Sequence, residues 1–464
     1  MRTAPATPAN GPSIALPLAF VLTGLAALCA GVVWLVLQPG LLSTYHYNQD
    51  VIAVTHLFVL GWICTIIMGA MYQLVPVALE THLYSNKLGC AQFVFHLVGV
   101  AGMVWAFRAR KMAALAHYAS VFAFGVILFV YNMARTLRRT PRWNITASAV
   151  AASLFWISMA VTAGLSIAAA KCDYDPALAL APPAWIAAIL RGLQSFGVYV
   201  AHFGAIRTMH AHAHLGGAGF FIMLIVGVSY KLVPMFTLSE VQSRARAVGS
   251  IILLNIGLAG SFLAILRHSP LESPFACVIV AALALYGWEL AAILRARKRR
   301  ALDWGVKYFL TAVALLLPVS ALSLVLCWSG LPQNTFTGQL ENLYGFLALI
   351  GVVTFAILGM LYKIVPFLVW FGQYSRLIGR VPVPSLPDLY SARLQSLGYR
   401  AFLIGLAATS EGILLSNETG VRIGCGFLAL AVSTMALNVA GMLSHFFKPA
   451  LPPAFKTSTP LKTA

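Results

Sequence analysis

Long apolar segments separated by short polar stretches run along almost the whole chain. Apolar runs of about 18 or more residues predict transmembrane helices, because lipid offers no hydrogen bonds and a helix satisfies its own backbone. We therefore predict an all-α integral membrane protein with twelve spans. The predicted spans cover residues 13–37, 50–78, 87–107, 112–135, 145–170, 207–236, 247–266, 273–295, 305–328, 338–369, 394–414 and 421–447. The segment 183–206 is also apolar, but Pro182, Pro183, Arg191 and Gln194 favour an interfacial helix there.

Three of these spans share one pattern without gaps. The copies begin at His56, His214 and Phe346, and each reaches a proline twenty positions later. The residues identical in all three copies are Gly61, Gly219 and Gly351; Gly69, Gly227 and Gly359; Tyr72, Tyr230 and Tyr362; Val75, Val233 and Val365; and Pro76, Pro234 and Pro366. We expect the glycines to let another helix or a flat ligand approach closely, and the prolines to end or kink the spans. The tyrosines should place their hydroxyls in the wet interface, and the lysines at the position shared by Gln73, Lys231 and Lys363 should extend toward it.

The three copies are the second, sixth and tenth predicted spans. Each copy comes four spans after the one before it, an even number, so all three cross the membrane in the same direction. The chain therefore divides into three four-helix units, residues 1–142, 143–303 and 304–464, related by a pseudo-threefold axis along the membrane normal. Transporters built from inverted repeats have the opposite relation between their repeats.

Charge fits this topology. Of the 464 residues 60% are apolar and only 9% charged, which excludes a soluble protein. The net charge of +19 comes from Lys and Arg in short loops, as the positive-inside rule expects, so nucleic acid is not the partner; the lipid bilayer is. The rule predicts a multi-pass protein of the bacterial inner membrane with both termini in the cytoplasm. The exceptions to this rule are Arg108, Arg110 and Lys111, which lie in the loop between the third and fourth spans, on the side opposite the cytoplasm in this topology.

Histidines supply the candidate chemistry. His56 and His214 occupy one repeat position, and His210 and His212 precede His214 in a His-Ala-His-Ala-His run; His96 lies in the middle of the third span. Neutral imidazole is a common heme and copper ligand, and polar groups inside a membrane tend to be functional. His210 and His214, at i and i+4, share a helix face and can bind one ion together. The alternative interpretation is a polar cap, or single histidines each satisfied by one hydrogen bond.

Acidic residues are scarce within the spans. Glu289, Glu341 and Glu411 are the main ones, and none pairs with a histidine by sequence spacing. No nucleophile and base can be assembled, which disfavours a hydrolase. The same scarcity disfavours proton-coupled transport.

Twelve spans with histidines near the outer ends of spans two and six resemble the catalytic subunit I of the heme-copper oxidase superfamily. The segments that begin at His56 and His214 are similar to those of its nitric oxide reductase and cbb3-type branches, and the NnrS family is a second similar group. The resemblance implies a b-type heme, held by His56 and His214, and copper near His210, His212, His214 or His96. It also implies a cytochrome or another electron-transfer partner.

This chain departs from that family at the remaining ligands. The seventh span has no histidine, and Asn342, Tyr344 and Phe346 stand where the family has a His-x-His pair. The resemblance therefore implies the scaffold more firmly than the activity. We expect a heme- or copper-binding protein of nitric oxide or oxygen redox metabolism, which as an enzyme would be an oxidoreductase. Two alternatives stay open: a non-catalytic protein of metal or heme handling or of oxidase assembly, and a transporter.

Overall fold

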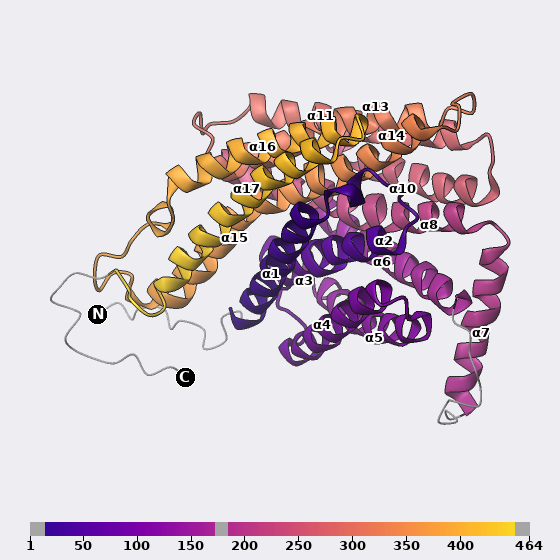
Figure 1. The fold of residues 1–464 in the computed structure, drawn as a ribbon. Coiled ribbons are helices and arrows are strands. Elements are labelled where there is room, and N and C mark those ends of the chain that lie inside the picture. The colour runs from indigo at the N-terminus through magenta and orange to yellow at the C-terminus, as the bar shows by residue number, and fades with distance from the viewer. Residues whose placement is uncertain (1–13, 172–183, 451–464) are drawn as a thin grey trace.

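The computed structural model describes residues 14–171 and 184–450, and these residues form helices joined by short loops (Figure 1). Eleven helical segments in these ranges are long and apolar enough to cross a membrane, which confirms a multi-pass helical membrane protein. The predicted eleventh span is also a helix, α16 (Ala392–Leu414), but it is not among those eleven. It carries Arg393, Arg400 and Glu411, and it packs along α17 (Glu418–Ser444).

The three repeated spans have the same backbone form. The first consists of α2 (Gln49–His56), η2 (Leu57–Cys64) and α3 (Thr65–Ala78). The second consists of α8 (Ala205–His214), η3 (Leu215–Ile222) and α9 (Met223–Thr237). The third consists of α14 (Thr335–Phe346), η4 (Leu347–Thr354) and α15 (Phe355–Tyr374). The segments η2, η3 and η4 are π-helices of eight residues that begin directly after His56, His214 and Phe346. The sequence repeat therefore has a shared backbone feature at this position. π-Helices are rare and often occur at functional sites.

The helices around the repeated spans also recur in their packing. One helix packs against each repeated span: α1 (Ala15–Leu37), α6 (Ile145–Ala170) and α12 (Trp304–Ala314). Antiparallel pairs follow: α4 (Asn86–Arg108) with α5 (Met112–Leu137), α10 (Arg244–Arg267) with α11 (Glu272–Arg295), and α16 with α17. A single residue, Leu315, separates α12 from α13 (Leu316–Leu326). The helix is interrupted there because Pro318 has no N–H to donate to the carbonyl of Ala314.

One hydrogen bond recurs in all three antiparallel pairs. Serine caps the first helix of each pair, at Ser85, Ser243 and Ser391. The backbone N–H of each serine donates to a buried side chain on the second helix: Asn132 at 3.1 Å, Glu289 at 2.9 Å and Asn438 at 2.8 Å. The sequence repeat alone did not predict this second set of equivalent positions.

The proline-bearing halves of the repeated spans surround an apolar cavity of about 100 Å³. Equivalent positions line it in every copy. They are Ile66, Leu224 and Ala356; Ile67, Ile225 and Ile357; Ala70, Val228 and Met360; and Leu74, Leu232 and Ile364. The three spans therefore meet along a common line, and η4 contacts both η2 and η3. Trp62 Nε1 donates to Thr354 Oγ1 at 3.0 Å across one of these contacts.

The expectation of wet tyrosine hydroxyls is wrong. Tyr72, Tyr230 and Tyr362 are all buried. Their hydroxyls bond to protein groups: Gln92 at 3.2 Å, Ser250 at 2.8 Å and Asn438 at 3.2 Å. Close packing of neighbouring helices around the tyrosines excludes solvent, and the protein satisfies each hydroxyl instead.

The prolines and Lys363 of the repeat differ between copies in their surroundings. Pro76 and Pro234 lie near the ends of their helices, but α15 continues for eight residues beyond Pro366, to Tyr374. Lys363 does not extend freely to solvent, because its ammonium pairs with the carboxylate of Asp303.

The positive charges of the loop after α4 have a local partner. Arg108 and Arg110 lie 3.4 Å and 3.7 Å from the carboxylate oxygens of Asp50. Lys111 lies over the Trp105 ring, 5.3 Å from its centroid. Asp50 and Trp105 therefore give all three cations a local partner.

The segment 184–201 forms the helix α7 (Ala184–Ala201), which lies at the edge of the bundle beside α6 (Figure 1). It is not among the helices that are long and apolar enough to span. Pro182 and Pro183 lie outside the described residues.

Candidate functional site: the histidine end of the bundle

Histidines gather at the end of the bundle where α2, α8 and α14 begin, which we call the histidine end. His56 ends α2, while His210, His212 and His214 belong to α8. His46 joins them from the loop that precedes α2. All five side chains are partly buried.

Three of these imidazoles have the same tautomer. His56 Nδ1 donates to Ile52 O at 2.8 Å, and His214 Nδ1 donates to His210 O at 2.7 Å. His212 Nδ1 donates to Ala160 O of α6 at 2.9 Å. Since a carbonyl can only accept, each neutral ring keeps its proton on Nδ1 and presents the lone pair of Nε2. The unprotonated Nε2 of such a ring can bind a metal ion without first losing a proton.

The two histidines at the repeat position have different neighbours. The His56 ring lies 4.8 Å from that of Phe107 and within electrostatic range of His212. The His214 ring lies 6.1 Å from that of Tyr344, whose hydroxyl is 3.4 Å from His214 Nε2. Tyr344 of α14 thus faces a histidine of α8.

Open space lies beside His214. A Cβ atom added to Gly216 or Gly217 would meet no other atom within 4 Å, and the same holds for Gly345 on the facing α14. Gly216 and Gly217 are partly buried, and a larger side chain at either position would meet no steric barrier. The equivalent positions in the first copy hold Phe58 and Val59.

His46 and His210 point their Nε2 atoms at each other. These atoms are 3.1 Å apart, and the rings are stacked with centroids 5.1 Å apart. His46 Nδ1 lies 3.4 Å from Glu341 Oε2. Burial lowers the pKa of His46, which favours its neutral form.

Residue spacing does not predict this contact. It indicated that none of the acidic residues pairs with a histidine by spacing, and Glu341 reaches His46 only through the tertiary fold. His210 and His46 are 164 positions apart. The one local signal was the polar run Thr44-Tyr45-His46-Tyr47-Asn48 directly before a predicted span.

His96 occupies a different place, inside the bundle between α4 and η2. It is buried, and its Nε2 lies 2.8 Å from Thr65 Oγ1 and 3.2 Å from Leu60 O. It thereby satisfies a carbonyl of the π-helix, and its buried Nδ1 has no hydrogen-bond partner among the described residues.

The cluster is a set of pairs rather than a closed cage. Across residues 14–171 and 184–450, no three His, Cys, Asp or Glu side chains are grouped so that they could hold a metal ion by themselves. Metal binding at His210, His212, His214 or His96 therefore stays a prediction, and the structure assigns His210 a partner, His46, that was not predicted. No protein-family model matches the chain, and no curated protein matches it.

Proposed function

We propose that this protein is a divergent relative of subunit I of the heme-copper oxidases, which binds heme through His56 and His214 in a bacterial inner membrane. The observation that carries the proposal is the shared position of these two histidines, each directly before a π-helix. π-Helices often accompany functional sites, and intramembrane histidines are costly unless they are used.

The packing supports three equivalent four-helix units, residues 1–142, 143–303 and 304–464. Each unit would contain the repeated span, one helix packed against it and one antiparallel pair. Each antiparallel pair has the same hydrogen bond from a serine N–H. The units would also meet in a cycle, since α5 packs on α6, α11 on α13, and α17 on α1. This arrangement is the one expected for a pseudo-threefold axis through the central cavity.

The two histidines have the chemistry of heme ligands. His56 and His214 each offer an unprotonated Nε2, which is the atom that binds heme iron. The space beside Gly216 and Gly217 is open and flanked by the partly buried His214 ring. When bound, heme would carry an electron or bind a diatomic gas such as nitric oxide or oxygen. The carbonyls of Ile52 and His210 would hold the two imidazoles in the ligating orientation.

An absorption spectrum with metal analysis tests this proposal. We expect the purified protein to show a Soret band that is lost in both His56→Ala and His214→Ala. The matched control is His117→Ala, since His117 is exposed and makes the same Nδ1 hydrogen bond to the carbonyl four residues earlier, at 2.7 Å. A spectrum without a Soret band contradicts heme binding.

Turnover then separates the enzyme from the alternatives. An oxidoreductase should consume nitric oxide or oxygen when a cytochrome or another electron donor is supplied. Heme or metal bound without such turnover favours a role in metal handling or oxidase assembly. Transport in proteoliposomes by protein without cofactor favours the transporter.

A further inference from the structure

Arginines gather where α5 ends, at the end of the bundle opposite the histidine end. Arg135 lies in the last turn of α5, and Arg138, Arg139 and Arg142 follow it. The helices α4 and α5 lie at an outer edge of the bundle (Figure 1), so their ends are accessible from the surrounding membrane. The positive-inside rule assigns this end to the cytoplasm, but it requires no particular arrangement of the side chains.

Arg135 and Arg139, which we call the arginine pair, share one aromatic ring. Their guanidinium carbons each lie 4.8 Å from the centroid of the Tyr84 ring. The Tyr131 ring packs edge-on against that of Tyr84, with centroids 5.8 Å apart, and lies 5.9 Å from the Arg135 guanidinium. These cation–π contacts attract both guanidinium groups without using their N–H donors.

Hydrogen bonds to α5 fix the backbone at Tyr84. Tyr84 N donates to Thr136 Oγ1 at 3.0 Å, and Ser85 N donates to Asn132 Oδ1 at 3.1 Å. Asn132 Nδ2 donates in return to Ser85 O at 2.8 Å. The helix that carries the arginine pair therefore also positions the ring, which reduces the entropy lost when the pair binds a ligand.

The arginine pair has no anionic partner in the part of the chain that the structure describes. Neither guanidinium forms a hydrogen bond or an ion pair with residues 14–171 or 184–450. By contrast, Arg108 pairs with Asp50, and Arg246 pairs with Glu289. Because two cations against one ring repel each other, an anion bound to both would stabilise the arrangement.

The equivalent helix pairs lack these arginines. The hydrogen bond from the serine N–H recurs in α10–α11 and in α16–α17. Counted from the residues that accept it, the positions of the arginine pair hold Ala292 and Ala296 in one case and Gly441 and His445 in the other. The packing of such a helix pair therefore does not require the two arginines, which favours a role in binding.

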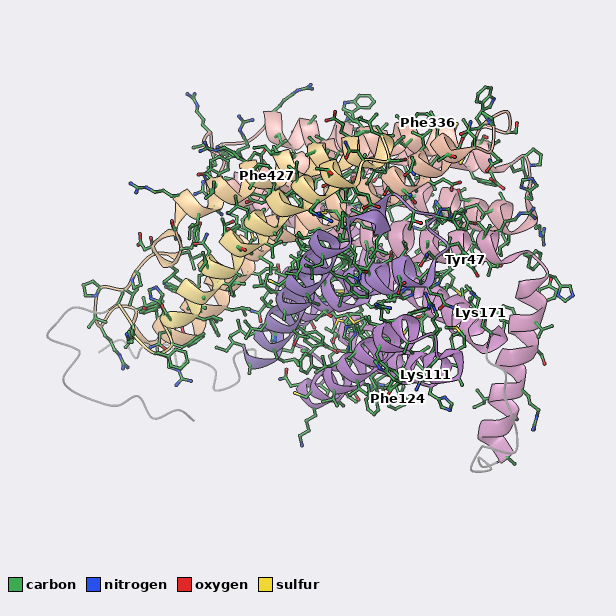
Figure 2. All side chains as sticks on the ribbon, viewed as in Figure 1. Tyr47, Lys111, Phe124, Lys171, Phe336 and Phe427 are labelled. Atoms are coloured by element: carbon green, nitrogen blue, oxygen red, sulfur yellow. The ribbon has the colours of Figure 1, made fainter. Side chains whose placement is uncertain are left out.

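An exposed apolar face of α5 leads to the arginine pair. Phe124, Ile127 and Tyr131 are 46%, 62% and 47% exposed, and their spacing of three or four residues continues to Arg135. Figure 2 shows Phe124 at the outer surface of the bundle. From Phe124 to Tyr131 this face extends about 10 Å along the helix. It can therefore contact the first part of an acyl chain whose headgroup lies at the arginines.

We propose that the arginine pair binds the phosphate of an anionic glycerophospholipid, with Tyr84 as the positioning residue. Guanidinium groups bind phosphate oxygens through paired N–H donors, and basic pockets between membrane helices bind anionic headgroups. The described residues place no carboxylate against the pair, so the ammonium of a zwitterionic lipid would find only further cations there. This site goes beyond heme binding at His56 and His214 and does not depend on it.

Native mass spectrometry of the full-length protein in detergent tests the site, with phosphatidylglycerol as the probe. We expect one phosphatidylglycerol to bind per chain, more tightly than phosphatidylcholine. Arg135→Gln and Arg139→Gln should each weaken binding about tenfold, because each removes a charge-assisted hydrogen bond to phosphate. Tyr84→Leu should also weaken it, whereas Tyr84→Phe keeps the ring and should bind as the wild type does.

The controls separate this site from general attraction between the protein and anionic lipid. The double variant Arg295→Gln/Arg300→Gln removes two exposed arginines from the segment before α12 and should leave binding unchanged. Inorganic phosphate should not displace the lipid, since it cannot contact the apolar face of α5. Equal weakening by this variant and by Arg135→Gln/Arg139→Gln, equal binding of phosphatidylcholine, or displacement by inorganic phosphate would each overturn the proposal. The Soret band of every variant should match that of the wild type, so the result is independent of heme binding.

Discussion

Replacement of Glu289 should destabilise the protein strongly, because this carboxylate is fully buried and has three donors. Its oxygens accept from Gln242 N at 2.6 Å, Ser243 N at 2.9 Å and Arg246 Nε at 2.8 Å. Removal of one partner of a buried ion pair typically costs about 3–5 kcal/mol. The Arg246 side chain is 26% exposed and can regain water, so we expect the lower value, about 3 kcal/mol, for Glu289→Ala.

Glu289→Gln should cost about half as much, because an amide oxygen still accepts from the backbone but the charge is lost. The assay is unfolding in mixed detergent micelles, followed by tryptophan fluorescence. Glu272→Gln is the matched control, since its carboxylate is more exposed and its nearest charged partner is His268 at 3.9 Å. If Glu289→Ala changed the free energy of unfolding no more than Glu272→Gln does, the carboxylate would not hold the start of α10.

Three further outcomes follow from the packing. Tyr230→Phe should lower the free energy of unfolding by about 1–2 kcal/mol, because the buried hydroxyl bonds to a buried serine; no change would mean that solvent reaches it. Gly227→Leu should prevent folding, since a Cβ there would overlap a side chain of α6, whereas Gly216→Leu should fold but bind less heme, both read by size-exclusion profile and Soret band; equal behaviour of the two would contradict the difference in packing between these positions. The segment after Ser444 should become more sensitive to protease as the pH falls below about 6.5. Burial lowers the pKa of His445, so its neutral form is favoured in the folded protein, and this contribution to stability is lost as the pH falls from the ordinary value through the lowered one. His445→Gln removes the titrating imidazole and should make protease sensitivity nearly independent of pH; an unchanged pH dependence in this variant would contradict the interpretation.

The hydrophobic pattern predicted the helices well, because membrane spans have few alternatives once their length and polarity are known. The repeat likewise predicted three equivalent helices, and the shared π-helices add a backbone feature to it. The tyrosines were wrongly predicted, since their burial depends on neighbouring helices that the repeat motif does not include.

The histidine end was only partly predictable. His56 and His214 were identified because the repeat aligns them, and this required no tertiary information. His46 and Glu341 were not identified as partners, because their contact joins a loop to a distant helix and leaves no pattern in spacing. Tyr344 was interpreted as a position where a ligand is missing, and the structure adds that its hydroxyl faces His214.

The absorption spectrum of the purified wild-type protein, recorded with its iron and copper content, tests the central claim most directly. We predict a Soret band with iron bound to the chain, and loss of that band in His56→Ala and His214→Ala but not in His117→Ala. A wild-type protein that folds and carries neither a Soret band nor bound metal would contradict the claim.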